Sequence, residues 1–135
     1  MKVWVNGTFD VLHRGHIELF KYAYGFGEVR VGIDLDERVK KFKGKDRPIN
    51  TFEDRKYLIE SIKYVDSVVG FGSDDELKQE IKKWGSTLMV IGSDYKDKKI
   101  IGSQLFDKII YFDRIINYSS TKIINNKNEK DISNR

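Results

Sequence analysis

Apolar residues along this chain follow two alternating patterns. Short runs of β-branched and aromatic residues, which are typical of buried strands, are separated by segments whose apolar residues recur every three or four positions, as in helices. In the first such segment Ile17, Phe20 and Tyr24 share one helical face. The pattern predicts strands at 3–5, 29–33, 67–71, 87–91 and 108–112, and helices at 15–24, 34–41, 51–63, 74–84 and 119–125.

The alternation of strands and helices predicts an α/β fold. We expect a single domain with a Rossmann-like, doubly wound, five-stranded parallel sheet that carries helices on both faces. Ligands bind such sheets at the carboxyl ends of the strands, near the point where the strand order reverses. The strand at 3–5 should lie beside that point. We place the domain at 1–125 and predict that the polar residues 126–135 form a disordered tail.

Residues 7–16, with the sequence Gly-Thr-Phe-Asp-Val-Leu-His-Arg-Gly-His, follow the first predicted strand. They contain the two histidines of the chain, His13 and His16, at the predicted strand-to-helix turn. The N-terminus of a helix favours anions, and imidazoles add hydrogen-bond donors there. A bound triphosphate would raise the imidazole pKa and favour the charged form, and Gly15 leaves space for a phosphate to approach. The turn is therefore a candidate phosphate site.

Two other interpretations of the histidine pair stay open. Imidazoles one helical turn apart can share a metal ion, although the chain has no cysteine and no third histidine, so carboxylates would have to complete a zinc site. The pair could also do no more than cap and solvate the turn. The glycines and Thr8 around the pair favour phosphate binding over both alternatives.

This segment resembles the signature of the cytidylyltransferase-like nucleotidylyltransferases, whose hallmark is a His-x-Gly-His motif. Within that family the chain is most similar to the heptose-1-phosphate adenylyltransferases, and next to the glycerol-3-phosphate cytidylyltransferases. The resemblance runs to about residue 125, through segments at 43–50, 54–55, 64–66, 92–95 and 119–123.

The resemblance implies nucleotidyl transfer. In this reaction a phosphate oxygen of an acceptor attacks the α-phosphorus of a nucleoside triphosphate, and pyrophosphate leaves without any protein nucleophile. Catalysis then depends on alignment of the two substrates and on cationic donors that neutralise charge. A Mg²⁺ ion, bound mainly through the triphosphate, is the expected cofactor, and we predict no metal site made of protein ligands.

The resemblance also assigns roles to particular residues. His13 and His16 would contact the triphosphate and the transition state. Lys43 or Lys45, with Lys43 favoured, would hold the acceptor phosphate, and the planar guanidinium of Arg55 would bind it in a bidentate way. The predicted catalytic residues are His13, His16, Lys43 and Arg114; the nucleotide-binding residues are Gly7, Thr8, Phe9, Asp10, Gly15, Gly92, Asp94, Ser119, Ser120 and Thr121; the acceptor-phosphate residues are Lys43, Lys45 and Arg55.

The substrates expected from the resemblance are a nucleoside triphosphate, with ATP favoured, and a sugar or polyol phosphate, so that the product is an activated nucleotide sugar. A CTP-dependent glycerol-3-phosphate cytidylyltransferase is an alternative. The family often has Arg-Thr-Glu-Gly-Ile-Ser before a Ser/Thr pair, whereas residues 114–121 here are Arg-Ile-Ile-Asn-Tyr-Ser-Ser-Thr. That departure motivates a second alternative, a nucleotide-binding module without transfer activity.

The composition of the chain indicates which kinds of ligand it can bind. The chain has 135 residues, of which 39% are hydrophobic, and 25 basic against 21 acidic residues give a net charge of +4. This mild surplus suits small polyanionic ligands and is spread too evenly for a nucleic-acid site. No apolar stretch is long enough for a bilayer, and with no targeting segment and no cysteine we expect a cytoplasmic protein. The resemblance adds the expectation of a homodimer.

Overall fold

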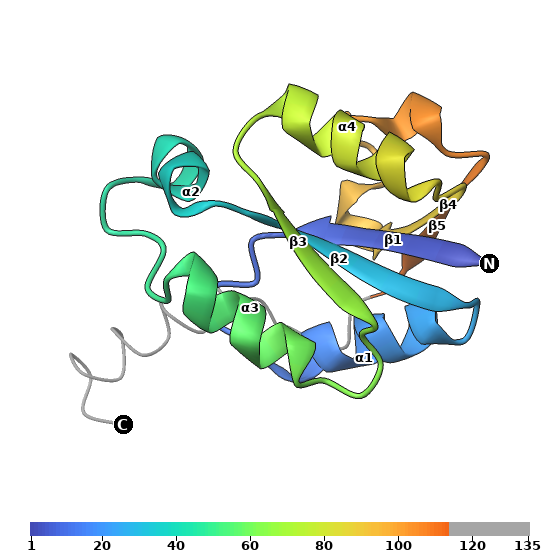
Figure 1. The fold of residues 1–135 in the computed structure, drawn as a ribbon, viewed down its shortest axis with the longest axis horizontal. Helices are drawn as coiled ribbons and strands as arrows, with labels where there is room; N and C mark the ends of the chain where they lie inside the picture. The colour runs from blue at the N-terminus through green and yellow to red at the C-terminus, as the bar shows by residue number, and fades with distance from the viewer. Residues whose placement is uncertain (114–135) are drawn as a thin grey trace.

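The computed structural model describes residues 1–113 and confirms the predicted fold class (Figure 1). Its strands form one parallel sheet in the order β3-β2-β1-β4-β5, so the strand order reverses beside β1. The carboxyl end of β1 therefore lies at the point where ligands bind this class of sheet. The strands are β1 (Lys2–Gly7), β2 (Glu28–Asp34), β3 (Ser67–Phe71), β4 (Leu88–Gly92) and β5 (Lys108–Phe112).

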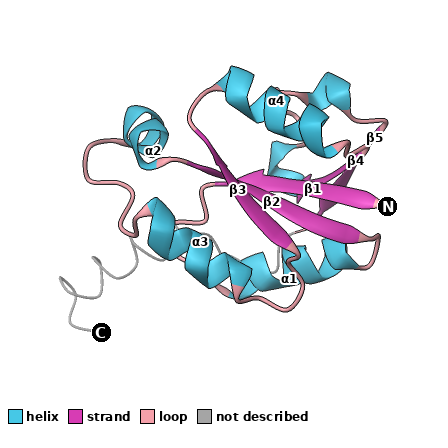
Figure 2. Cartoon of the chain, in the orientation of Figure 1, coloured by secondary structure: helices cyan, strands magenta, loops and turns pink. Residues whose placement is uncertain are grey.

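Helices cover both faces of the sheet. α1 and α3 lie on one face and α4 on the other, while α2 follows directly from the carboxyl end of β2 (Figure 2). In the described part of the chain, no helix combines the length and the apolar character needed to cross a bilayer. The helices are α1 (Arg14–Tyr24), α2 (Asp36–Lys43), α3 (Phe52–Glu60) and α4 (Asp74–Trp84), with short 3₁₀ turns η1 (Ser93–Tyr95) and η2 (Ser103–Leu105).

The residues of β1 alternate between two hydrophobic clusters. Val3 and Val5 pack in the cluster that contains Phe20 of α1. Trp4 points to the opposite face and packs in the cluster that contains Ile81 of α4. Because both faces of the central strand are buried, its sequence is a continuous apolar run instead of an apolar and polar alternation.

A glycine in β2 makes room for the largest of these side chains. Gly32 pairs with Asn6 of β1, and a Cβ atom at Gly32 would lie 2.4 Å from Cζ2 of Trp4. The indole therefore lies over the backbone of β2, where any larger residue would collide with it. This contact sets the position of the Trp4 ring beside the carboxyl end of β1.

The predicted element boundaries are close to the observed ones, with two informative differences. β2 continues to Asp34, which pairs with Phe71 of β3, so α2 begins at Asp36 and not at residue 34. α3 ends at Glu60 instead of residue 63, because the backbone N–H groups of Ser61 and Ile62 donate to carbonyls three residues before them and the last turn tightens. The helix predicted at 119–125 and the tail at 126–135 lie outside the described residues.

Candidate active site

The first helix begins with a capping box made by the two histidines. His13 is the N-cap residue, and its Nδ1 accepts a hydrogen bond from the backbone N–H of Gly15 at 3.1 Å. His16 accepts a hydrogen bond at its own Nδ1 from the backbone N–H of His13, at 3.3 Å. The two rings stack, with centroids 3.7 Å apart. Both imidazoles are thus held at the N-terminus of α1, where the helix dipole favours anions.

The capping bonds also define which nitrogen carries the proton. An Nδ1 atom that accepts a hydrogen bond holds no proton, so the neutral rings of His13 and His16 carry theirs on Nε2. Nε2 is therefore the donor atom of each imidazole. The charged form that we expect beside a triphosphate would have to give up a capping bond, because protonated Nδ1 cannot accept.

Phe9 supports the histidines from the protein interior. Its backbone is in the left-handed region, with φ of 49°, and the residue is 7% exposed. The ring meets His16 edge to face, with centroids 5.1 Å apart, and also packs on Phe20 of α1. A Cβ atom at Gly7 would lie 3.0 Å from Cζ of Phe9, so glycine at that position lets the ring fold back under the turn. Packing by Phe9 thus limits where the imidazole of His16 can go.

Asp10 holds a neighbouring loop on the motif. Its side chain accepts hydrogen bonds from the backbone N–H groups of Ile49 and Asn50, both at 2.9 Å, and from Nε of Arg47 at 2.7 Å. Burial raises the pKa of Asp10, but the hydrogen bonds from Asn50, Ile49 and Arg47 outweigh burial, and the pKa lies below its ordinary value. The carboxylate thus orients this loop, and a nucleotide contact by Asp10 stays a prediction.

Arg55 is placed differently from the sequence prediction. Its side chain is buried, with 1% of the residue exposed, and its guanidinium faces the protein interior. Nη1 donates to the backbone carbonyls of Thr8 at 3.0 Å and Asp34 at 2.8 Å. Nε donates to the carbonyl of Asn50, and Nη2 donates to the carboxylate of Asp36 at 2.7 Å. In this arrangement Arg55 is a positioning residue, not the acceptor-phosphate ligand that we predicted.

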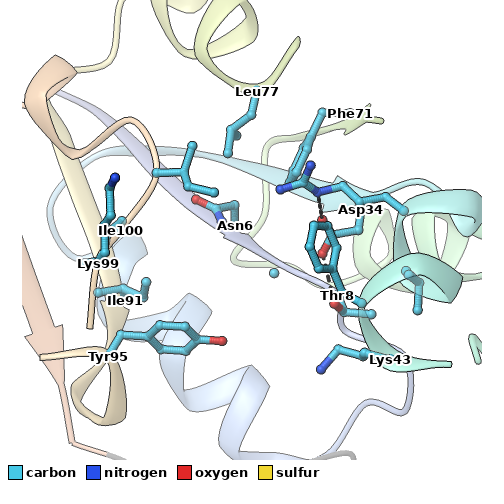
Figure 3. A pocket seen from close by; sticks show the side chains of 15 residues that line it. Asn6, Thr8, Asp34, Lys43, Phe71, Leu77, Ile91, Tyr95, Lys99 and Ile100 are labelled. Atoms are coloured by element: carbon cyan, nitrogen blue, oxygen red, sulfur yellow. Dashed lines mark hydrogen bonds and ion pairs between the residues drawn. The ribbon is translucent and has the colours of Figure 1, made fainter. Parts of the chain in front are cut away.

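A cavity of about 290 Å³ opens at the carboxyl edge of the sheet, on the face covered by α4 (Figure 3). It takes lining residues from the ends of β1 to β4, from α2 and from the segment after β4. Cationic and polar groups occupy one part of its wall and apolar side chains the other. The lining residues are Asn6, Gly7, Thr8, Asp34, Arg38, Val39, Phe42, Lys43, Phe71, Leu77, Ile91, Tyr95, Lys99, Ile100 and Ile101.

Only one of the two lysines that the sequence left as alternatives for the acceptor phosphate lines the cavity. Lys43, the last residue of α2, lines the cavity, and Figure 3 shows its ammonium end directed toward the Tyr95 hydroxyl across it. Lys45 is exposed in the loop after α2 and is not among the lining residues. The structure therefore brings Lys43 to the cavity and leaves Lys45 outside.

The opening motif borders this cavity through its first residues. Gly7 and Thr8 line it, and the Thr8 hydroxyl donates to the carboxylate of Asp34 at 2.9 Å. His13 and His16 come five and eight residues further along the chain, at the start of α1, and do not line it. The cavity and the histidine turn are thus two adjoining parts of one region, at the end of β1.

Four polar or charged lining residues were missed by the sequence analysis: Asn6, Asp34, Arg38 and Lys99. Asp34 and Asn6 stand at the carboxyl ends of strands, which is a signal for ligand contact in this fold. Arg38 follows Asp34 by four residues, the spacing of a helical ion pair. Tyr95 belongs to segment 92–95, which the sequence analysis had singled out, whereas Lys99 carries no such signal, because only the path of the chain after β4 brings it to the cavity.

Several predicted site residues are described only in part or not at all. Gly92 ends β4 and is the N-cap of η1, the 3₁₀ turn that contains Asp94. Arg114, Ser119, Ser120 and Thr121 lie outside the described residues. Within residues 1–113 there is no group of three or more His, Cys, Asp or Glu side chains that could hold a metal ion.

The fold, the cavity and the histidine turn define an α/β protein with a candidate ligand site at the carboxyl edge of its sheet. A family model described as cytidylyltransferase-like matches residues 4–133, and the chain belongs to that family. The chain is 40% identical over 123 residues to the bifunctional protein HldE of Nitratiruptor sp., which covers 90% of this chain and 26% of that protein. It is 38% identical over 133 residues to the bifunctional protein HldE of Campylobacter concisus, and the match covers 98% of this chain and 28% of that protein.

This chain thus spans about a quarter of the length of these curated relatives. Among solved structures, it is similar to the crystal structure of the lipopolysaccharide core biosynthesis protein from Thermoplasma volcanium. The two have a TM-score of 0.70 and 25% sequence identity, and the match covers 85% of this chain and 98% of that one. The shared fold extends over nearly the whole of the solved chain.

We predict that Arg55→Lys lowers the free energy of unfolding by about 3 kcal/mol, because one ammonium group cannot replace the four hydrogen bonds of the buried guanidinium. Urea denaturation measures the change. Arg14→Lys is the matched control, since the Arg14 side chain is 70% exposed, and it should change stability by less than about 0.5 kcal/mol. Wild-type stability together with weaker acceptor binding in Arg55→Lys would instead support the phosphate contact.

We predict that Asp10→Asn reduces the acid sensitivity of folding. A carboxyl group whose pKa is lowered in the folded state stabilises the protein above its unfolded pKa, and that stability is lost as the pH falls through the folded pKa. The free energy of unfolding of the wild type should therefore decline below about pH 4. The variant should have a lower free energy of unfolding at pH 7, and this value should change less between pH 7 and 3. Urea denaturation at pH values from 7 to 3 measures the free energy of unfolding of both proteins. The exposed Asp97→Asn should follow the wild-type profile.

Proposed function

We propose that the chain transfers a nucleoside monophosphate from a nucleoside triphosphate, with ATP favoured, to a sugar or polyol phosphate. The observation that carries this proposal is the meeting of two sites at the end of β1. The histidine capping box offers donors at a helix N-terminus, and the adjoining cavity holds Lys43. A triphosphate at the first and an acceptor phosphate at the second would be neighbours, as direct transfer requires.

The proposed step is a single displacement at phosphorus. An oxygen of the acceptor phosphate forms a bond to the α-phosphorus, and the bond from that phosphorus to the bridging oxygen breaks. Pyrophosphate leaves with the electron pair. The Nε2–H donors of His13 and His16 would hold triphosphate oxygens as charge builds on them. Stacking and the capping box hold both rings at the N-terminus of α1, which supports this role.

Lys43 is the proposed ligand of the acceptor phosphate. Its charge stands at the C-terminus of α2, at the side of the cavity next to Thr8 in Figure 3. A charge-assisted hydrogen bond from an ammonium group to a phosphate oxygen is about twice as strong as a neutral one. Lysine also suits an acceptor that must shift during the reaction, since it binds phosphate as a point charge with rotatable donors.

The proposed Mg²⁺ ion would arrive with the triphosphate. The nearby carboxylates have other partners, because Asp10 is bound by Arg47 and Asp34 is bound by Arg38. The residues that surround the site thus suit phosphate oxygens better than they suit a bare cation. When bound, the ion would neutralise charge on the β- and γ-phosphates.

The remaining assignments stay proposals. Gly7, Phe9 and Gly15 would shape the triphosphate site, while Gly92 and Asp94 would contact the nucleotide from the end of β4. Arg114 and residues 119–121 would complete it, within a domain that extends to residue 125 and forms a homodimer. Similarity to bifunctional proteins and to a lipopolysaccharide core biosynthesis protein supports a sugar phosphate as the acceptor.

The proposed function predicts pyrophosphate release from one of the four nucleoside triphosphates in the presence of a sugar or polyol phosphate. His13→Asn and His16→Gln are informative variants, because asparagine at the N-cap and glutamine three residues later can retain the capping box without imidazole donors. We expect each variant to keep the wild-type melting temperature and to lose about 100-fold in kcat.

The outcomes of this assay separate the alternatives. Turnover with CTP and glycerol 3-phosphate alone would replace the ATP proposal. Nucleotide binding without turnover on any acceptor would indicate a binding module. Full activity in both histidine variants would show that the imidazoles are not part of the chemistry.

We also predict that Lys43→Ala raises the KM for the acceptor phosphate about tenfold and leaves the KM for the triphosphate unchanged. Lys45→Ala is the matched control, because Lys45 stands two residues away and outside the cavity lining. It should change both constants by less than about twofold. Steady-state pyrophosphate release measures them. The reverse result, with the larger effect at Lys45, would move the acceptor phosphate to the loop after α2.

A further inference from the structure

Two polar side chains meet on the cavity face of the sheet. Asn6 of β1 pairs in register with Gly32 of β2, and Asp34 follows Gly32 by two residues. Because side chains alternate along a strand, Asn6 and Asp34 point to the same face, which is the face covered by α4. Both line the cavity, and Figure 3 shows the Asn6 side chain in the middle of the lining residues. They form a polar patch on this face of the sheet.

The Asn6 amide has a defined orientation. The Nε1–H group of Trp4 can only donate, and it bonds the amide at 3.0 Å, so the amide atom there is Oδ1. Gly32 lets the indole take this position, as described above. The Nδ2 group of Asn6 is then the other end of the amide, and it makes no hydrogen bond within residues 1–113. Asn6 therefore presents a donor to the cavity.

Asp34 presents acceptors to the same cavity. Its Oδ2 accepts from the Thr8 hydroxyl at 2.9 Å and its Oδ1 from Nε of Arg38 at 2.8 Å. A carboxylate has about four acceptor positions, so two remain. The Asp34 side chain is 18% exposed, and the Arg38 guanidinium is held in turn by Asp74 at 2.7 Å and over the Phe71 ring. The ion pair thus has a fixed geometry.

The charges around Asp34 disfavour a cationic ligand. Arg38 neutralises the carboxylate, and two further cations, Lys43 and Lys99, line the same cavity. A neutral hydroxyl that donates to Asp34 fits this field better than an ammonium group does. The Asn6 donor likewise suits a hydroxyl oxygen.

The rest of the wall suits the carbon skeleton of a sugar. Phe71 and Leu77 lie on one side of the cavity and Ile91 and Ile100 on another, all apolar and partly or fully buried (Figure 3). Such surfaces pack against the C–H groups of a ring while polar groups bind its hydroxyls. At about 290 Å³ the cavity is at the small end of ligand pockets, which suits a single sugar unit.

We propose that Asn6 and Asp34 determine acceptor specificity by binding hydroxyl groups of a polyhydroxylated acceptor phosphate, with Asn6 as donor and Asp34 as acceptor. The proposal rests on the function proposed above, since it places the acceptor in the cavity beside Lys43. It adds that recognition of the acceptor goes beyond its phosphate. An acceptor without hydroxyls would leave the amide nitrogen of Asn6 unpaired in the cavity, at a cost in binding.

The test compares acceptors in the pyrophosphate-release assay. The hydroxylated acceptors are glucose 1-phosphate, mannose 1-phosphate, heptose 1-phosphates and glycerol 3-phosphate. Ethyl phosphate has no hydroxyl, and phosphoethanolamine carries a cation. The readout is the ratio of kcat/KM for the best hydroxylated acceptor to kcat/KM for ethyl phosphate, because effects on phosphate binding alone cancel in this ratio.

Two isosteric variants change the polar patch. Asn6→Asp keeps an oxygen for the Trp4 indole and replaces the donor, while Asp34→Asn removes one acceptor. We expect each to lower the ratio about tenfold, with little change in the KM for the triphosphate. Glu37→Gln is the matched control for charge, since its side chain is 90% exposed on α2, and it should leave the ratio unchanged. Melting temperatures confirm that the variants fold.

The outcomes distinguish this proposal from the one on which it rests. Pyrophosphate release with an unchanged ratio in both variants would overturn the role of Asn6 and Asp34 and leave the nucleotidyl transfer intact. Preference for phosphoethanolamine would also overturn it, in favour of an ammonium site. Absence of release with every acceptor would contradict the transfer function. Calorimetric titration of glucose 1-phosphate and ethyl phosphate into the wild type and the same variants would then test the hydroxyl contacts. A lower affinity of the variants for glucose 1-phosphate, with an unchanged affinity for ethyl phosphate, would support them.

Discussion

The buried guanidinium of Arg55 holds together the segments that build the site. It donates to backbone carbonyls at the end of β1, at the end of β2 and before α3, and to the Asp36 carboxylate at the start of α2. Burial of a charge is costly unless it is paired and hydrogen-bonded, and here its donors have partners. The strand ends that carry Thr8 and Asp34 are thereby held at one relative position, and the cavity between them depends on it.

The histidine turn shows how one pair of side chains can serve both folding and chemistry. The Nδ1 atoms of His13 and His16 satisfy backbone N–H groups that the first turn of a helix leaves without partners. This leaves Nε2 as the donor atom of each ring. Capping and phosphate binding were separate interpretations of the sequence. In the neutral rings the two roles would use different nitrogens, so one ring can do both.

Pattern and spacing predicted the sheet and the strand-to-helix turn, because each depends on residues close together in sequence. They failed for Arg55, whose partners lie between 5 and 47 residues away and consist mostly of backbone carbonyls. Nothing in a linear pattern distinguishes an arginine that binds phosphate from one that binds carbonyl groups. The partners of Asp10 likewise come from distant residues, at positions 47–50, so the sequence alone could not show which groups its carboxylate orients.

By itself, the sequence determined the fold class, the family and the position of the histidine turn, since apolar periodicity and a local motif carry that information. The tertiary structure decided which polar groups face the cavity. Asn6 presents its nitrogen because Trp4 takes its oxygen, and Trp4 can do so because Gly32 of the next strand leaves room for the indole. Such a chain of contacts crosses strands, and only packing in three dimensions brings its members together.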